Sequence, residues 1–183
     1  MRKLIFATNL TADGCCDHAK GTGSDELHEY FTDLLREAGL LVYGRKTYQL
    51  MVPFWPDVAR SQSMSKISNE FARVFASIPI AVFSRTLDTA EGNARIVRGN
   101  LRDEILKWKQ EPGKDILAGG VELPRQLVEL GLVDEFRIVI HPVIVGEGRR
   151  LFDDLRLQER VPLRLLNSQV LSSGSVALHY AKQ

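Results

Sequence analysis

Three short stretches of the chain carry residue types that hold phosphate groups in other proteins. They read YGRKT at Tyr43 to Thr47, VFSRT at Val82 to Thr86 and LAGGVE at Leu117 to Glu122. In each stretch a run of apolar residues meets glycine, a hydroxyl or a cation. Glycine lets backbone amides approach a ligand closely, and the start of a helix exposes N–H groups that attract anions.

The first stretch offers the most complete set of groups. Gly44 allows the close approach, Arg45 and Lys46 supply positive charge, and Thr47 adds a hydroxyl donor. This chemistry fits a diphosphate.

The other two stretches offer matching groups. Ser84 and Arg85 fit a further phosphate, because a guanidinium binds such groups through two parallel hydrogen bonds. Gly119 and Gly120 open another helix and again bring amides within reach, with Val121 and Glu122 following. Each stretch also has a simpler interpretation, in which the glycine makes a turn and the cation is a solvated surface charge.

Hydrophobic periodicity indicates the elements that must position these residues. Apolar and branched runs predict strands at 3–9, 40–43, 78–84, 95–97 and 115–120. Amphipathic spacing predicts helices at 24–39 (capped by Ser24), 46–51 (stopped by Pro53 and Pro56), around 67–75, from 100 (capped by Asn100), and around 123–130, where Leu123, Leu127 and Leu130 share one face. From Asp134 onward three strand-like runs follow without a helix between them. The pattern predicts an α/β fold: one mixed, mostly parallel sheet, antiparallel at its C-terminal end, with helices on both faces.

Composition limits the classes of function. The 183 residues suit one domain over 1–183, and the net charge of +1 gives no field for a nucleic acid or a membrane surface. No apolar run approaches the length that spans a bilayer, and Cys15 and Cys16 are too close for an ordinary disulfide, so a cytoplasmic protein is expected. The cysteines, with His18, lack a second pair at zinc-like spacing, and no metal site is expected. Standard glycine-rich nucleotide motifs are absent, so the residues alone do not specify a nucleotide. They predict an α/β domain with a phosphate-bearing ligand.

The order of several motifs resembles that of the dihydrofolate-reductase-like superfamily. TADG, YGRKTY, FWP, VFSRTL, LAGG and LVDEFRIVIHPVIVGEGRRLF follow one another along nearly the whole chain. The resemblance is closer to the RibD C-terminal domain, the reductase part of bifunctional riboflavin-biosynthesis enzymes. The zinc deaminase motifs of those enzymes are absent here.

This resemblance implies an eight-stranded sheet that binds NADPH across its strand ends. The amides of residues 44–47 and 120–122 would hold the pyrophosphate, and Arg45, Ser84 and Arg85 would surround the 2′-phosphate. The backbone near Ala7 and Thr8 would meet the nicotinamide. Two arginines near a phosphate that NADH lacks favour NADPH.

The expected reaction is hydride transfer to a small heterocycle, with a proton from a carboxylic acid or an ordered water. In dihydrofolate reductases an acid lies on the helix before the GRKT motif, but counting back without gaps reaches His28. Glu26 is a candidate proton donor, or a residue that balances the helix dipole, and Asp13 is a second candidate, or part of a turn. Tyr48 and Trp55 are candidates for lining a planar substrate, or for packing.

Two alternatives stay open at this level: a dihydrofolate reductase proper, and a domain that binds nucleotide or assembles without turnover. The missing acid disfavours the first. The resemblance also implies a homodimer, for which the strand-rich carboxyl end would supply an edge or an apolar face.

Overall fold

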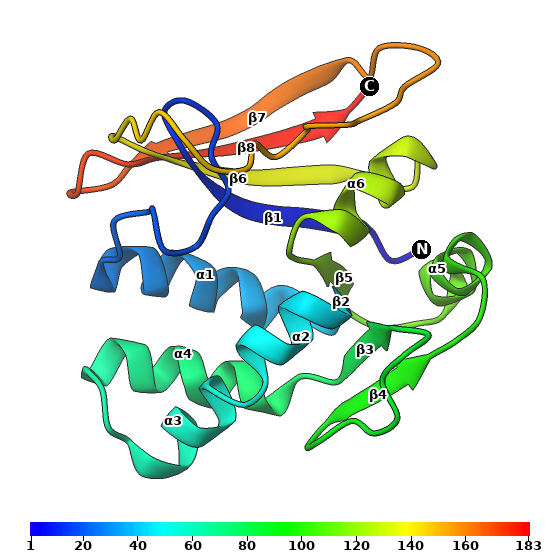
Figure 1. Cartoon of the computed structure of the whole chain (residues 1–183), viewed down its shortest axis with the longest axis horizontal. Helices are drawn as coiled ribbons and strands as arrows, with labels where there is room; N and C mark the ends of the chain where they lie inside the picture. Colours follow the sequence, from blue (N-terminus) through cyan, green and yellow to red (C-terminus); the bar gives the residue numbers. More distant parts are fainter.

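The computed structural model describes all 183 residues, and its centre is one sheet of eight strands in the order β4-β3-β2-β5-β1-β6-β8-β7 (Figure 1). The first six strands in this order run parallel, and β8 and β7 are antiparallel to their neighbours. The strands are β1 (Leu4–Thr11), β2 (Ala38–Gly44), β3 (Ile80–Phe83), β4 (Ala94–Val97), β5 (Asp115–Ala118), β6 (Glu135–His141), β7 (Leu163–Val170) and β8 (Val176–Lys182). The predicted mixed sheet is therefore confirmed, including its antiparallel C-terminal end.

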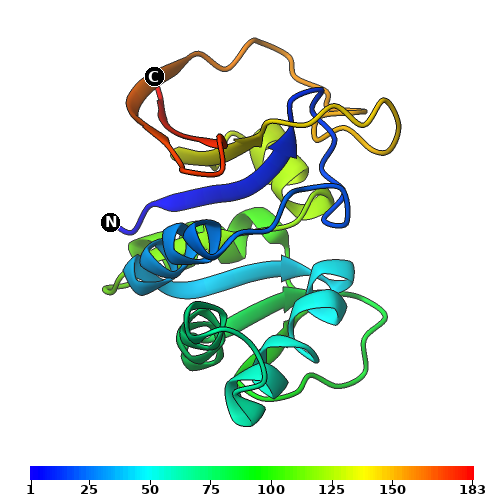
Figure 2. The ribbon, with the colours of Figure 1, turned by 90° about the vertical axis from the view of Figure 1, so that its left-hand side faces the viewer.

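Helices cover both faces of this sheet, as Figure 2 shows from the side. They are α1 (Asp25–Glu37), α2 (Arg45–Met51), α3 (Trp55–Ser61), α4 (Lys66–Ser77), α5 (Leu101–Gln110) and α6 (Glu122–Glu129). None of them combines the length and the apolar character needed to cross a membrane.

Alternating strand residues build a separate core on each face, because successive side chains of a strand point to opposite sides. Leu40 and Val42 belong to a cluster that includes residues of α5 and α6. Leu41 and Tyr43 belong to another cluster, which includes residues of α1 and α4. The sheet is thus the middle of three layers, and the three-layer α/β architecture expected from the sequence is confirmed.

Two element boundaries differ from the prediction. The helix expected to end at Gly39 ends at Glu37, and β2 begins at Ala38, so Gly39 lies within the strand. A Cβ at Gly39 would lie 3.1 Å from Cβ of Lys114, which explains a glycine there without a helix end. The second helix begins one residue earlier than expected, at Arg45.

Helix α3 was not predicted at all. In the sequence, Pro53 and Pro56 suggest a break, yet Pro53 precedes α3 and Pro56 lies in its first turn, where a proline costs no hydrogen bond. Leu130, expected on the buried face of α6, is instead its C-cap residue and is exposed. The correct buried neighbours of Leu123 and Leu127 on that helix are Pro124 and Val128.

Candidate functional site

The carboxyl ends of β3, β2 and β5 lie side by side. These strands are parallel neighbours, with Gly44 opposite Phe83 in one pair and Val42 opposite Ala118 in the other. The three predicted phosphate-binding stretches therefore meet where these strands end. Ligands of open α/β sheets bind outside the carboxyl ends of the strands.

The two glycines after β5 make the closest contact between these stretches. Gly120 has a φ of +95°, and a Cβ there would overlap the Thr47 side chain. A Cβ at Gly119 would lie 2.9 Å from Cε1 of Tyr43, closer than real Cβ contacts. The chain thus forms a cradle beside α2 that only glycine fits, and this brings Gly120 and Thr47 together as the proposed site requires.

Backbone N–H groups in this cradle are available to a ligand. The amides of Gly120 and Val121 donate to no backbone acceptor outside regular structure, and neither residue lies in a helix or strand. Because buried or partly buried N–H groups are normally paired, two adjacent free donors indicate a place for an acceptor.

Glu122, the first residue of α6, has its carboxylate paired with two cations. It accepts hydrogen bonds from Arg149 and from Arg125, and these pairings hold its pKa below the ordinary value, with Arg149 as the main cause. Its negative charge is therefore balanced at the point where the diphosphate is expected.

The second stretch, at Val82 to Thr86, is joined to the first by a hydrogen bond. The Arg45 guanidinium donates to Oγ1 of Thr86 over 2.8 Å. Ser84 Oγ accepts from the amides of Thr86 and Leu87, which leaves its hydroxyl hydrogen free to donate. Lys46 and Arg85 are exposed.

Strand β1 offers free backbone next to the glycine cradle. Its pairing with β5 ends at Phe6 opposite Ala118, whereas its pairing with β6 continues through Ala7 and Thr8. On the side toward Gly119, Ala7 and Thr8 therefore have no strand partner. Successive residues of a strand direct their N–H and C=O groups to opposite sides, and here Lys3 bonds toward β5 whereas Leu4 bonds toward β6. The amide and carbonyl of Ala7 therefore face the open side and can bind a planar group such as a carboxamide, whereas those of Thr8 face β6.

Asp13 holds a loop together and is not placed to give up a proton. It accepts from Thr11 Oγ1 at 2.6 Å and from the amides of Val145 and Gly146, and the Thr11 bond is the main cause that lowers its pKa to about 2. A carboxylate with this pKa stays ionised at neutral pH. These contacts favour the turn role of Asp13 over the alternative role of proton donor.

Glu26 is engaged in a similar way. Its Oε2 accepts from both the amide and the hydroxyl of Ser172, in the turn between β7 and β8. The carboxylate thus anchors this turn to the first turn of α1. The predicted catalytic role of Glu26 is not supported by these contacts.

Tyr48 lies inside the core. It is 6% exposed, and its hydroxyl accepts from the amide of Glu91 at 2.8 Å. This burial favours the packing role of Tyr48 over a role in lining a substrate pocket. Trp55 packs edge-on against Phe71 with ring centroids 4.5 Å apart, and against His28 at 5.5 Å.

His28, at the position of the expected acid, is half-buried in this aromatic cluster. Its Nδ1 lies 3.2 Å from Ser68 Oγ, and burial lowers the pKa of the ring. The imidazole is therefore neutral at physiological pH. No three His, Cys, Asp or Glu side chains converge in a way that could hold a metal ion.

Sequence reasoning missed three residues near the site. Thr86 accepts a hydrogen bond from the Arg45 guanidinium. Arg98 donates to two carbonyls of the loop after β3. Arg149, in the long connection between β6 and β7, pairs with Glu122. Residues 84–86 were marked by their SRT motif, so Thr86 was within reach. Arg98 and Arg149 lie outside the phosphate-type stretches and carried no local signal.

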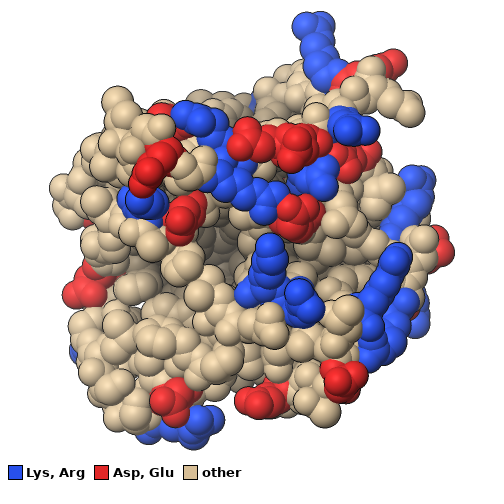
Figure 3. Space-filling model, in the orientation of Figure 1, with Lys and Arg blue, Asp and Glu red and all other residues tan.

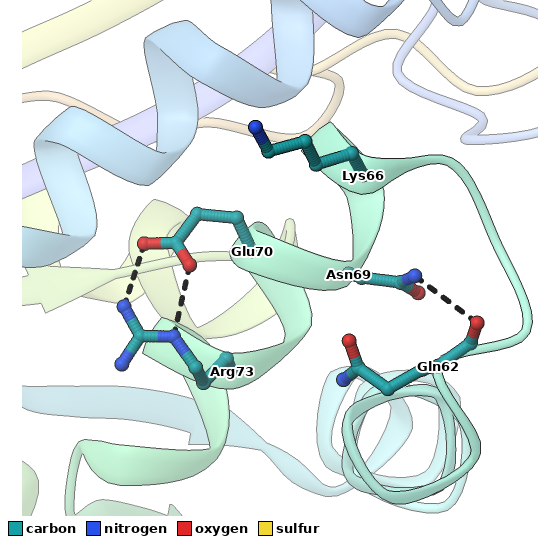
Figure 4. A pocket seen from close by; sticks show the side chains of 5 residues that line it. All are labelled: Gln62, Lys66, Asn69, Glu70 and Arg73. Atoms are coloured by element: carbon teal, nitrogen blue, oxygen red, sulfur yellow. Dashed lines mark hydrogen bonds and ion pairs between the residues drawn. The ribbon is translucent and has the colours of Figure 1, made fainter.

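The face in Figure 3 is hollowed near its centre and bordered by clustered charges of both signs. A separate polar depression lies between α3 and α4, lined by Gln62, Lys66, Asn69, Glu70 and Arg73 (Figure 4). Its Glu70 already binds Arg73 and Arg36, so its charge is satisfied. None of the predicted cofactor residues lines this depression.

These features define an α/β protein of the dihydrofolate-reductase-like fold, in which the predicted ligand-binding stretches meet at the carboxyl ends of β3, β2 and β5. A family model described as the RibD C-terminal domain matches residues 2–177. The chain belongs to the RibD C-terminal domain family, whose members typically bind NADP(H).

Similar proteins agree with this assignment. YyaP of Bacillus subtilis, an uncharacterized protein, is 38% identical over 183 residues, covering 98% of this chain and 94% of the relative. YwjB of the same organism, also uncharacterized, is 27% identical and covers 99% of this chain and 98% of its own.

Solved structures share the fold at lower identity. A putative riboflavin biosynthesis protein from Shewanella sp. PV-4 has a TM-score of 0.73 at 20% identity, with 99% of both chains covered. Dihydrofolate reductase from Enterococcus faecalis, complexed with NADP(H), has a TM-score of 0.64 at 14% identity, covering 99% of this chain and 96% of that one. The deaminase/uracil reductase of Thermotoga maritima has a TM-score of 0.68 at 15% identity and matches over 57% of its length.

Proposed function

We propose that the protein is an NADPH-dependent reductase of a small heterocyclic substrate, of the kind that acts on 5-amino-6-(5-phosphoribosylamino)uracil. The observation that carries this proposal is the cradle between Gly120 and Thr47, where a Cβ would fill the space and where two adjacent amides lack acceptors. Membership of a family that typically binds NADP(H) supports the same conclusion.

In this proposal each part of the dinucleotide has its own residues. The amides after β5 and at the start of α2 hold the diphosphate, with Arg45 and Lys46 as counter-charge. Ser84 and Arg85, together with Arg45, bind the 2′-phosphate. The unpaired backbone of Ala7, beside Thr8, holds the nicotinamide carboxamide.

NADPH, when bound, supplies the hydride that reduces a C=N or C=O bond. The chain's own part is to orient both reactants at the sheet edge and to exclude water. Since Asp13 and Glu26 are committed to loop contacts, we propose that the proton comes from an ordered water.

Equilibrium titration of the protein with NADPH and with NADH, followed by nicotinamide fluorescence, tests the cofactor. We expect saturable binding of both, with NADPH tighter by about tenfold or more, since hydrogen bonds to charged groups contribute about 1.5–3 kcal/mol. Absence of binding by both dinucleotides would contradict the proposal.

Turnover assays separate the alternatives. Oxidation of NADPH with the aminouracil ribotide and none with dihydrofolate supports the proposed reaction. Reduction of dihydrofolate at ordinary enzymic rates would instead identify a dihydrofolate reductase. Tight NADPH binding without turnover of either compound would favour a binding or assembly domain.

Self-association is part of the same proposal. Strand β7 lies at the edge of the sheet and all eight of its residues are exposed, Leu163, Leu165 and Val170 among them. An open edge with exposed apolar side chains suits pairing with a second copy of the chain. The partner expected in solution is therefore a second, symmetry-related protomer.

A further inference from the structure

The connection from β3 to β4, residues 84–93, crosses between two neighbouring parallel strands in an unusual way. It has ten residues and no helix. Such crossovers normally need a dozen or more residues and an α-helix. A short connection without regular structure depends on neighbouring side chains for its shape.

Arg98, just after β4, supplies the most extensive support. One guanidinium nitrogen donates to the Ser84 carbonyl at 3.2 Å, and the other donates to the Leu87 carbonyl at 2.6 Å. The planar group thus spans residues 84–87 from outside. Its side chain is on the surface, and its bonds are to neutral oxygens, so its positive charge is not cancelled by a carboxylate.

Two further side chains fix the same connection from α2. Arg45 donates to Thr86 Oγ1, and Tyr48 accepts from the Glu91 amide. Asn93 anchors the far end of the connection by donating to the Ala76 and Ile78 carbonyls. Arg98 is therefore one of several supports, and it is the side chain from outside the turn that contacts both residue 84 and residue 87.

The grip of Arg98 determines which groups this turn presents. Ser84 Oγ curls the backbone by accepting from the amides of Thr86 and Leu87. The carbonyls of Ser84 and Leu87 are directed to Arg98, so these two electron-rich oxygens are kept from a bound anion. What remains for a ligand is the Ser84 hydroxyl hydrogen and the Arg85 and Arg45 guanidinium groups.

The charge around the turn is also uneven. Arg45, Lys46, Arg85 and Arg98 form no ion pair, whereas arginines elsewhere do, such as Arg36, Arg73 and Arg125. The acidic residues of the connection, Asp88 and Glu91, pair with none of these cations. Figure 3 shows Lys and Arg gathered at its right, where Figure 1 draws β3, β4 and α5.

We infer that Arg98 is a positioning residue for discrimination between NADPH and NADH: it fixes residues 84–87 so that Ser84 and Arg85 meet the 2′-phosphate. This inference rests on the proposed function. The effect of Arg98 on selectivity depends on geometry, because the rigid guanidinium group holds the Ser84 and Leu87 carbonyls at once and the single ammonium group of a lysine cannot.

Dissociation constants of NADPH and NADH, measured for the wild type, Arg98→Gln, Arg98→Lys and Arg102→Gln, test the inference. Arg102 is an exposed arginine of α5 and serves as the matched charge control. Both Arg98 variants should weaken NADPH binding by about tenfold, as expected for lost charge-assisted contacts, and leave NADH binding within about twofold. Arg102→Gln should leave the ratio of the two constants unchanged.

Hydrogen exchange of the Thr86 and Leu87 amides provides a readout that needs no cofactor. Exchange should be faster in both Arg98 variants and unchanged in Arg102→Gln, because Arg98 holds the Ser84 and Leu87 carbonyls whereas the Arg102 side chain forms no hydrogen bond with the turn. Wild-type selectivity in Arg98→Gln would overturn this inference alone. Selectivity retained by Arg98→Lys but lost in Arg98→Gln would show that charge, and not positioning, is responsible. A wild type that binds neither dinucleotide would overturn the proposed function and this inference with it.

Discussion

The geometry of the candidate site depends more on Gly120 than on any charged residue. Its left-handed φ of +95° and its contact with Thr47 each exclude a side chain. A cation can be moved or replaced by a neighbour, but the approach of the chain after β5 to α2 depends on the missing Cβ. Replacing Gly120 with alanine, which adds a single methyl group, is therefore the most decisive substitution at the site.

Gly120→Ala should abolish or severely weaken NADPH binding, because the new Cβ must displace the Thr47 side chain. Gly14→Ala is the control: Gly14 also has a positive φ, of +82°, but a Cβ there would contact nothing within 4 Å. Both variants should lose about 1–2 kcal/mol of unfolding free energy from backbone strain. Urea denaturation and NADPH titration of each variant check this, and equal loss of binding in both would show that strain alone is responsible.

Asp13 makes stability depend on pH in a predictable direction. Its folded pKa of about 2 lies below the ordinary value of 3.8, so the ionised form stabilises the fold. This contribution is fully present above about pH 4, the unfolded value, and is lost as the pH falls toward 2. Asp13→Asn should therefore be less stable than the wild type at pH 6, and the difference should shrink as the pH falls from 4 to 2.

Urea unfolding at several pH values measures this difference. Asp88→Asn is the control, because Asp88 is exposed and its side chain has no partner. If the gap between Asp13→Asn and the wild type stays constant down to pH 2, the carboxylate does not anchor the loop.

The sequence indicates which residue types gather at the candidate site, but not the long-range contacts that they make. Gly44, Arg45, Thr47 and Gly120 were recognisable because glycine and cations follow apolar runs. The contacts of Asp13 and Glu26 were not predictable, because a carboxylate in a turn or at a helix start looks the same in the sequence whether it gives a proton or accepts hydrogen bonds from a distant loop. Those partners lie more than 130 residues away in the sequence, where no local pattern reaches.

At the scale of elements, local capping signals were reliable and proline was not. The helices beginning after Ser24 and Asn100 have the expected caps, with side-chain oxygens accepting from amides in the first turn. Helix α3 was missed because Pro53 and Pro56 were taken as breaks, although a proline in a first turn is compatible with a helix. The burial of Trp55 against Phe71 stabilises this helix, and that contact is between elements.

The Asn100 cap should contribute measurably to stability. Its Oδ1 accepts from the amides of Arg102 and Asp103, and α5 then places Ile105 and Trp108 in the core. Asn100→Ala should lower the free energy of unfolding by about 1 kcal/mol, and Asn100→Asp should change it little. Chemical denaturation of both variants measures the effect, and an alanine variant as stable as the wild type would contradict the role of the cap.

At the scale of the whole molecule, strand order was the feature that spacing could not provide. Alternating helices and strands predict a mostly parallel sheet, but β5 lies between β2 and β1, and β1 is fourth from the β7 edge. Only this order places Gly120 beside Thr47 and exposes the free edge of Ala7 next to the glycines. Hydrophobic periodicity does not predict this strand order, whereas the order of the motifs, through the resemblance to a family of known fold, does.

The same order leaves β7 at the end of the sheet, which leads to a prediction about assembly. Leu165 is 51% exposed and Val170 is 74% exposed, on a strand that pairs with β8 alone. Solvent-exposed apolar side chains along an open edge favour association, and two copies of β7 can pair antiparallel about a two-fold axis. The wild type should therefore sediment as a dimer at micromolar concentrations.

Leu165→Asp should dissociate this dimer, because two copies of the new carboxylate would be brought close together in the symmetric interface. Leu106→Asp is the control, since Leu106 is an exposed leucine on α5, far along the chain from the β7 edge. Analytical ultracentrifugation of the wild type and both variants decides the matter. A monomeric wild type, or a Leu165→Asp variant that remains dimeric, would place the interface elsewhere or remove it, whereas a selective loss of the dimer in Leu165→Asp would show that the open edge of the sheet is where two protomers meet.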